Sequence, residues 1–151
     1  DFEFHGTTEH YAKWTKFVQS SDPWADGTTP LLEFYTATHE ARKVPIRADF
    51  CLNVRLCIKP EVREEFLKVI ENNQKGSNQD EALCLQYDWG ESTTEANTFH
   101  FHEEYTGENA GKEGFEAHQK APHFLAWEEF AGTDPFTSPP VVSFYKSILI
   151  D

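Results

Sequence analysis

The chain has 151 residues, a formal net charge of −13 and 15% aromatic residues, among them 13 Phe and 4 Trp. An acidic surface repels phosphate backbones, which argues against nucleic acid as a partner, and no apolar run reaches the roughly 20 residues of a membrane span. A chain of this length forms one domain of ordinary size, which folds without disulfides or a structural metal.

The first 48 residues differ in pattern from the rest of the chain. Two helices are predicted in this part of the chain. The second, a short one, runs from Pro30 to about Arg42, because Thr29 suits the N-cap and proline suits the first helical position. We interpret residues 1–48 as a helical N-terminal extension or docking arm, and residues 49–151 as a separate domain. Side chains at helical spacing predict the first helix of the arm: Tyr11, Trp14, Phe17 and Val18.

The residues after Asp49 carry clear strand and helix patterns. Apolar residues alternate with polar ones over 50–58, which predicts a strand. Pro60 opens a helix whose apolar stripe ends at the polar run 74–78. A second strand is expected over residues 82–89, with Leu83, Leu85 and Tyr87 on one face, and a third over residues 98–105 after a polar connection.

The remaining third of the chain predicts one more helix and one more strand. The glycines of residues 107–111 lead into the helix, and Pro122 interrupts it before a short aromatic turn. A proline-rich loop over residues 132–140 then precedes a last strand, residues 141–150. The order strand–helix–strand–strand–helix–strand is the ferredoxin-like arrangement, so the predicted fold class is α+β.

Two segments carry the most specific motifs. Residues 99–105 read Phe-His-Phe-His-Glu-Glu-Tyr, and residues 115–124 read Phe-Glu-Ala-His-Gln-Lys-Ala-Pro-His-Phe. They resemble the antibiotic biosynthesis monooxygenase (ABM) family, and most closely its quinol monooxygenase branch. In that branch the third strand carries aromatic–x–aromatic–x–Glu–x–Tyr/Trp and the next helix carries His–x–x–x–x–His–Phe. The matching residues are Phe99, Phe101, Glu103, Tyr105, His118, His123 and Phe124.

The resemblance implies a ferredoxin-like protomer that pairs with a second copy into a dimeric α/β barrel. It also implies a pocket between sheet and helices in which a quinol or a related aromatic small molecule is oxidised by dioxygen, with no metal or flavin cofactor. The residues expected to bind that substrate are Phe99, Phe101, Tyr105, Phe115, Phe124 and Trp127.

A hydroquinone must lose a proton before it passes an electron to oxygen, which calls for a base near neutral pKa. His118, one helical turn after Phe115, is the candidate base, and His123 is the second candidate. Asn53 on the first strand is the candidate hydrogen-bond donor to the resulting oxyanion. Glu103 is expected to be a structural residue or a dimer contact.

Two cofactor hypotheses compete with this interpretation. His100, His102 and Glu104 lie on one strand face, but they diverge by about 7 Å per step, so we predict a solvated polar face and no metal site. The heme-degrading branch of the same family uses an Asn on the first strand and a Trp and a His in the second helix. Asn53 and His118 match two of these residues, but Glu108 stands where the Trp is needed.

An alternative from another class is a catalytically silent ABM-fold subunit. Its aromatic arm, residues 1–48, then docks a protein partner in a larger assembly. The cysteines fit no metal spacing and predict free thiols, which favours a reducing compartment. The chain begins at Asp1 rather than Met, so the cytoplasm and an organelle interior reached after removal of a targeting peptide are both compatible with the sequence.

Overall fold

The computed structural model describes residues 2–25, 28–37 and 48–148. The chain divides into two compact units, Asp1–Glu33 and Phe34–Asp151. In the first unit, α1 (Phe2–Gly6) precedes α2 (Glu9–Ser21), so the helix predicted from the aromatic spacing is confirmed. The side chains of Phe4 and Leu31 in this unit are 70% and 81% exposed.

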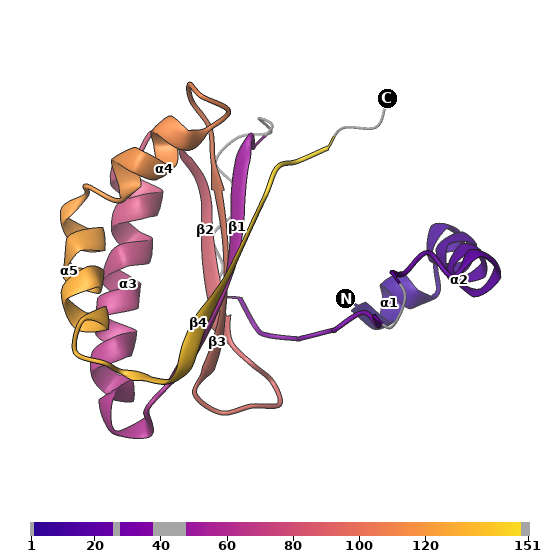
Figure 1. Cartoon of the computed structure of the whole chain (residues 1–151), viewed down its shortest axis with the longest axis horizontal. Coiled ribbons are helices and arrows are strands. Elements are labelled where there is room, and N and C mark those ends of the chain that lie inside the picture. The colour runs from indigo at the N-terminus through magenta and orange to yellow at the C-terminus, as the bar shows by residue number, and fades with distance from the viewer. Residues whose placement is uncertain (1, 26–27, 38–47, 149–151) are drawn as a thin grey trace. The chain divides into compact units, whose positions relative to one another are not determined.

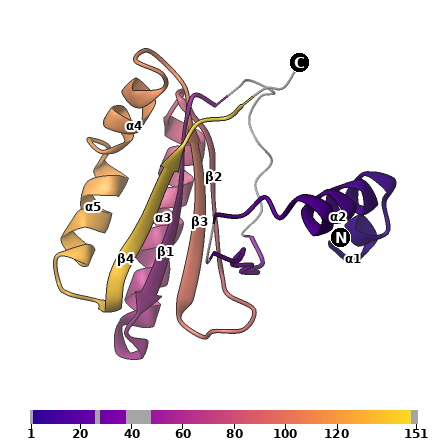
Figure 2. The same ribbon diagram turned by 45° about the vertical axis from the view of Figure 1, so that its right-hand side comes forward.

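The second unit contains an antiparallel sheet (Figures 1 and 2). Within the described part of the chain, four strands lie in the order β2-β3-β1-β4. The central strand β1 (Phe50–Ile58) pairs with β3 (Thr98–Tyr105) and β4 (Phe136–Tyr145), and β2 (Cys84–Glu91) pairs with β3. This arrangement confirms the predicted ferredoxin-like α+β fold.

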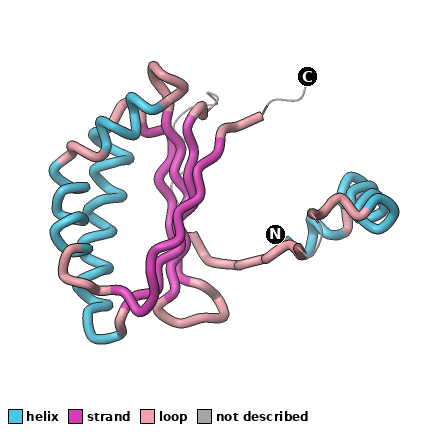
Figure 3. The backbone as a smooth tube through the Cα atoms, viewed as in Figure 1, coloured by secondary structure: helices cyan, strands magenta, loops and turns pink. Residues whose placement is uncertain are grey.

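Helices cover one face of this sheet as a separate layer (Figures 1 and 3). The layer consists of the short 3-10 helix η1 (Pro60–Val62), α3 (Arg63–Asp80), α4 (Lys112–His118) and α5 (Pro122–Ala131). The alternation in β1 explains the core, because every second side chain points to the helices. Buried members of the core include Leu52, Leu56, Phe66, Ile70, Phe99 and Tyr105.

Helix α3 runs beyond the polar residues 74–78, which were wrongly predicted to end it. These residues stay helical because their side chains bond to neighbouring elements. The amides of Gln74 and Asn78 donate to the carbonyl oxygen of Tyr87 in β2. Tertiary hydrogen bonds therefore outweigh a local composition typical of a loop.

A β-bulge changes the predicted faces of β2. The pairing with β3 shifts between Cys84 and Gln86, so an extra residue is inserted at Leu85. Leu85 consequently packs with Cys51 and Ala48, whereas Tyr87 packs in the core beneath the helices. The prediction that Leu85 and Tyr87 share a face was wrong.

Two further expectations near the C-terminus were also wrong. The residues after Pro122 form a ten-residue helix rather than a turn, because proline fits the first helical position and the rings of Trp127 and Phe130 pack against Phe66. Strand β4 begins at Phe136, so it contains Pro139 and Pro140, which were expected to lie in a loop. Proline is tolerated there because β4 is an edge strand.

The helix predicted from Pro30 does not form over residues 30–37, and residues 38–42 of that prediction lie outside the described residues. The segment 34–37 instead lies against the sheet. The Phe34 carbonyl oxygen accepts a hydrogen bond from Thr93 N at 2.9 Å, and the Tyr35 ring stacks on His100 at 5.5 Å. Gly90 permits this approach, since a Cβ atom there would lie 2.0 Å from the carbonyl oxygen of Thr36.

Candidate functional site

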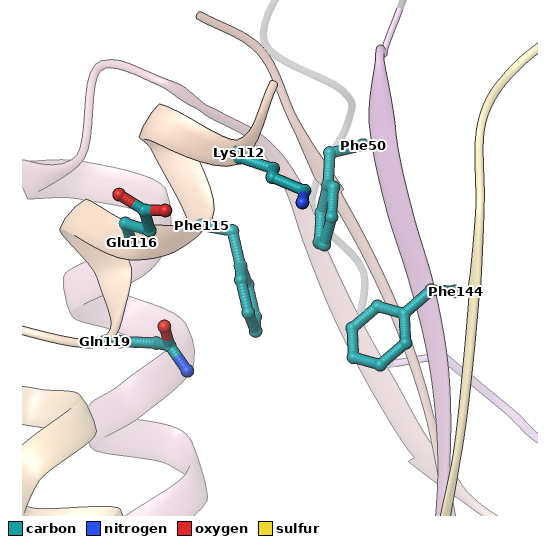
Figure 4. A pocket seen from close by; sticks show the side chains of 6 residues that line it. All are labelled: Phe50, Lys112, Phe115, Glu116, Gln119 and Phe144. Atoms are coloured by element: carbon teal, nitrogen blue, oxygen red, sulfur yellow. The ribbon is translucent and has the colours of Figure 1, made fainter. Parts of the chain in front are cut away.

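An aromatic pocket of about 460 Å³ opens between α4 and the edge of the sheet (Figure 4). Phe50 comes from β1, Phe115 from α4 and Phe144 from β4. Their ring centroids are separated by 5.0 Å, 5.6 Å and 6.0 Å. We call these three rings and the space beside them the aromatic pocket.

The sequence brings these groups together in a simple way. The β1–β4 register places Leu52 opposite Phe144, so Phe144 points to the same side of the sheet as Phe50. On the helix side, residues spaced by three or four positions face the pocket together. These residues are Lys112, Phe115, Glu116 and Gln119.

The polar groups at the aromatic pocket are those that suit a flat molecule with hydroxyl groups. The ammonium group of Lys112 points toward Phe50, and Gln119 lies on the other side of Phe115 (Figure 4). A planar aromatic ring gains dispersion and quadrupole interactions against phenyl rings, while a lysine ammonium favours an oxygen that carries negative charge.

Three residues of the predicted substrate site lie instead in a filled core. Phe99 and Tyr105 are fully buried and Phe101 is 4% exposed. Their rings pack on other side chains, with Phe99 at 4.5 Å from Phe66 and Phe101 at 6.2 Å from Trp89. Of the three, Tyr105 packs its ring 5.7 Å from Phe115, which is the member of the predicted set that lines the aromatic pocket.

His118 and His123 meet at the carboxylate of Glu81. His118 Nδ1 lies 2.8 Å and His123 Nε2 lies 2.5 Å from Glu81 Oε1. His118 is 1% exposed and His123 is 8% exposed. We call these three residues the His–Glu–His cluster.

The cluster joins the ends of three helices. Glu81 directly follows α3, His118 ends α4 and His123 lies in the first turn of α5. Burial alone would raise the pKa of Glu81, but the hydrogen bonds and charge interactions with the two histidines outweigh burial and lower that pKa. The carboxylate is therefore held in its ionised form between two N–H donors.

A second pocket of about 560 Å³ gives access to this cluster. Gly76, Glu81 and His123 are among the residues that line it. His118 lines neither the aromatic pocket nor the second pocket. Its ring contacts Phe124 at 4.8 Å and Tyr105 at 5.5 Å, so aromatic side chains surround it.

Glu103 is buried beneath the helices, on the strand face that it shares with Tyr105. The Tyr105 hydroxyl donates a hydrogen bond of 2.8 Å to Glu103 Oε2. Burial raises the pKa of Glu103, and this effect is larger than the opposing effects of His118 and of the Tyr105 hydrogen bond. The pair is a buried polar contact within the core of one chain.

Asn53 lies on the opposite face of the sheet from His118. Its Oδ1 is 3.0 Å from His102 Nδ1, which is also 3.0 Å from the Tyr145 hydroxyl. His100, expected on a solvated face, is 8% exposed because Tyr35 covers it. The structure therefore does not bring Asn53 together with the candidate bases.

Several residues of the site were not predicted from the sequence. The helical spacing of Lys112, Phe115, Glu116 and Gln119 was the available signal for one wall of the aromatic pocket. No local signal marks Glu81, which reaches His118 across 37 positions and His123 across 42. Trp127 lies in the helix layer, where its ring packs against Phe66.

These observations define the class of the protein as a ferredoxin-like α+β domain with an aromatic pocket between its sheet and its helices. The chain belongs to the antibiotic biosynthesis monooxygenase family, which residues 49–129 match. No curated protein matches the chain in sequence. Within residues 2–25, 28–37 and 48–148, no helix is long and apolar enough to cross a membrane.

Solved structures share this fold at low sequence identity. A candidate antibiotic biosynthesis monooxygenase from Caulobacter crescentus is 21% identical, with a TM-score of 0.59 over 68% of this chain and 92% of that chain. A second candidate antibiotic biosynthesis monooxygenase, from Nitrosomonas europaea, is 20% identical, with a TM-score of 0.58 over 66% of this chain and 99% of that chain. A candidate monooxygenase from Fusobacterium nucleatum is 15% identical, with a TM-score of 0.74 over 96% of this chain and 63% of that chain.

Proposed function

We propose that this chain is a monooxygenase that oxidises a quinol or a related electron-rich aromatic molecule with dioxygen in the aromatic pocket. Family membership and structural relatives named as candidate monooxygenases support the general reaction class. The observation that carries the substrate class is the set of three converging phenyl rings with Lys112 at their edge.

The chemistry of a quinol suits a site of this composition. A hydroquinone and one dioxygen molecule give a hydroxyquinone and one water, so the substrate itself supplies the reducing electrons and no separate cofactor is required by the balance. The substrate stacks against Phe50 and Phe144, and the Lys112 ammonium stabilises the oxygen that has lost its proton.

The role of His118 follows from its surroundings. Because it is buried and its Nδ1 is bonded to Glu81, we assign it as a positioning residue that fixes the end of α4, and thereby Phe115, rather than as the base. His123 belongs to the same polar contact and lines the second pocket.

A homodimer is part of the proposed function. Edge strand β4 exposes apolar side chains on the face away from the helices, including Val141 at 56% and Tyr145 at 42%. An exposed apolar edge strand is a surface that proteins normally cover. A second copy of the chain covers it in the dimeric barrel that the family resemblance implies.

The test is oxygen consumption by the full chain with a panel of mono- and bicyclic hydroquinones, corrected for autoxidation in buffer. We expect turnover that Phe144→Ala lowers by at least about tenfold in kcat/KM, because one stacking wall is removed. Phe144 is exposed, so its removal spares the core. Phe17→Ala in α2 is the control and leaves turnover unchanged. Oxidation no faster than the buffer rate across the panel contradicts the proposal.

A second candidate function is protein docking through the first unit of the chain. In that unit Phe2, Phe4, Leu31 and Leu32 are each more than half exposed. Exposed apolar side chains of this kind offer a surface that a protein partner can cover. Activity on hydroquinones separates this candidate from the enzyme, since a silent subunit has none.

A further inference from the structure

We propose that Glu81, His118 and His123 bind a divalent transition-metal ion of the zinc class. This site is separate from the aromatic pocket and from the quinol chemistry proposed above. It stands on the types of ligand, on their convergence and on access from solvent.

The ligand types select the metal. Each residue offers one ligand atom: the two histidines each offer an imidazole nitrogen, and Glu81 offers a carboxylate oxygen. These three atoms all lie within 4.8 Å of one another. Two nitrogen ligands favour Zn²⁺, Co²⁺ or Ni²⁺ over Mg²⁺ and Ca²⁺, which prefer oxygen. Two histidines with one glutamate form a ligand set that zinc accepts together with a water molecule.

The geometry is close to that required. Metal–ligand bonds of about 2.0–2.1 Å in a tetrahedral site place neighbouring ligand atoms about 3.3 Å apart. The two nitrogen–oxygen distances are now 2.8 Å and 2.5 Å. They have to open by less than about 1 Å for the ion to replace the two N–H hydrogen bonds with metal bonds.

Access and support come from the second pocket. Glu81 and His123 line it, so an ion and a water ligand enter from solvent, and Asp80 adds a further carboxylate to the lining. Gly76 forms the wall behind His123, because a Cβ atom there would lie 2.1 Å from His123 Nδ1. Glycine is unfavourable inside a helix relative to alanine, and here it makes room for the ring of His123.

The open face of the sheet supplies a matched comparison. His102 Nε2 lies 3.4 Å from Glu104 Oε1, so a His–Glu pair exists there as well. However, the third candidate of that face, His100, is stacked on Tyr35. The described residues hold one group of three such ligands that converge, which is the His–Glu–His cluster.

Bound metal ties together the ends of α3, α4 and α5. Phe115 of the aromatic pocket lies three residues before His118 on α4, so the ion fixes the helix that carries this ring. The ion therefore acts as a structural tie behind the pocket.

The test uses the full chain after chelator treatment and dialysis, titrated with Co²⁺. We expect one equivalent to bind with the visible absorption of low-symmetry, nitrogen- and oxygen-coordinated Co²⁺, and one equivalent of Zn²⁺ to remove that absorption. Glu81→Gln and His123→Gln should weaken binding by at least about 10–100-fold, the loss that even outer-shell partners cause. Gly76→Ala, which removes no ligand, should also weaken it.

His102→Gln is the matched control and should leave the titration unchanged. Far-ultraviolet circular dichroism shows whether each variant is folded. The wild-type titration tests the metal site even if a variant fails to fold. Absence of a one-equivalent Co²⁺ complex in the wild-type chain overturns the assignment. Loss of binding in His102→Gln equal to that in His123→Gln overturns it as well, because it moves the metal to the open face.

Discussion

Gly76 of α3 and His123 of α5 are in contact so close that any side chain at position 76 must displace the imidazole. A Cβ atom at Gly76 would lie 2.1 Å from Nδ1, 2.4 Å from Cγ and 2.6 Å from Cε1 of His123. The contact involves the whole ring rather than the tip of a flexible side chain. It fixes the ring against α3, and His123 Nε2 then reaches Glu81.

Gly76→Ala should therefore destabilise the protein, although alanine is the better helix former. Overpacking of a filled site costs about 1–3 kcal/mol, which exceeds the roughly 0.5–1 kcal/mol gained from helix propensity. Urea unfolding measures the difference. Gly132→Ala is the control, since its nearest contacts lie at 3.4 Å and its φ of −67° suits alanine. Equal stability of the two variants would show that His123 moves freely.

Lys112→Gln should lower kcat/KM for an accepted hydroquinone by about tenfold. Removal of a donor to a developing oxyanion costs about 10²–10³ in an enclosed site, and solvent at the mouth of the aromatic pocket reduces that effect. Steady-state oxygen uptake provides the measurement. Lys120→Gln is the control, because Lys120 is exposed and lies outside the pocket lining. Unchanged kinetics in Lys112→Gln would remove lysine from the proposed mechanism.

Glu103→Gln should stabilise the protein relative to the wild type, and the gain in stability should grow as pH rises. Burial raises the pKa of Glu103 above that of the unfolded chain, so the folded state holds a proton that the unfolded state releases from about pH 4 upward. The contribution of Glu103 to folding stability is thus fully present below the pKa that this group has in the unfolded chain. It is lost as pH rises through the higher pKa that the group has in the folded chain. The amide has no such loss, and its oxygen still accepts from Tyr105.

Thermal unfolding of both proteins between about pH 4 and pH 8 measures this effect, with each kcal/mol worth about 2–4 °C. The melting temperature of the variant should match the wild type at the acidic end and exceed it increasingly toward neutral pH. Glu129→Gln, an exposed residue of α5, should show a constant difference. A difference for Glu103→Gln that shrinks as pH rises would reverse the inferred protonation.

Val141→Asp should convert the proposed homodimer into a monomer. Val141 is on the exposed edge strand, and a buried unpaired charge at an interface is strongly unfavourable. Light scattering on the wild type should give about twice the 17.4 kDa chain mass. Leu125→Asp on α5, where leucine is 50% exposed, is the control and should stay dimeric. A monomeric wild type would refute the proposed assembly.

Deletion of residues 1–33 should leave the second unit folded and its hydroquinone turnover unchanged. The cut falls between the two compact units and keeps Phe34 and Tyr35, which contact the sheet. Circular dichroism and oxygen uptake give the two readouts. A truncated chain that folds but has lost turnover would make the first unit part of the enzyme rather than a docking element.

The order of helices and strands was predictable because it depends on local periodicity. Alternation in residues 50–58 marked a central strand, and the motif around Glu103 and His118 identified the ABM family. Predicted ends of elements were wrong where tertiary contacts determine them. Examples are the polar end of α3, bonded to β2, and residues 34–37, which pair with the sheet instead of forming a helix.

The sequence by itself determined the ferredoxin-like topology and the family, because side-chain periodicity and short motifs are properties of neighbouring residues. Only the tertiary structure decided which side chains meet. Phe50 and Phe144 form one pocket wall through the β1–β4 register, and Glu81 joins His118 and His123 because three helix ends converge. Such contacts depend on packing between segments far apart in the chain, and periodicity specifies the buried face of a segment but not its neighbour.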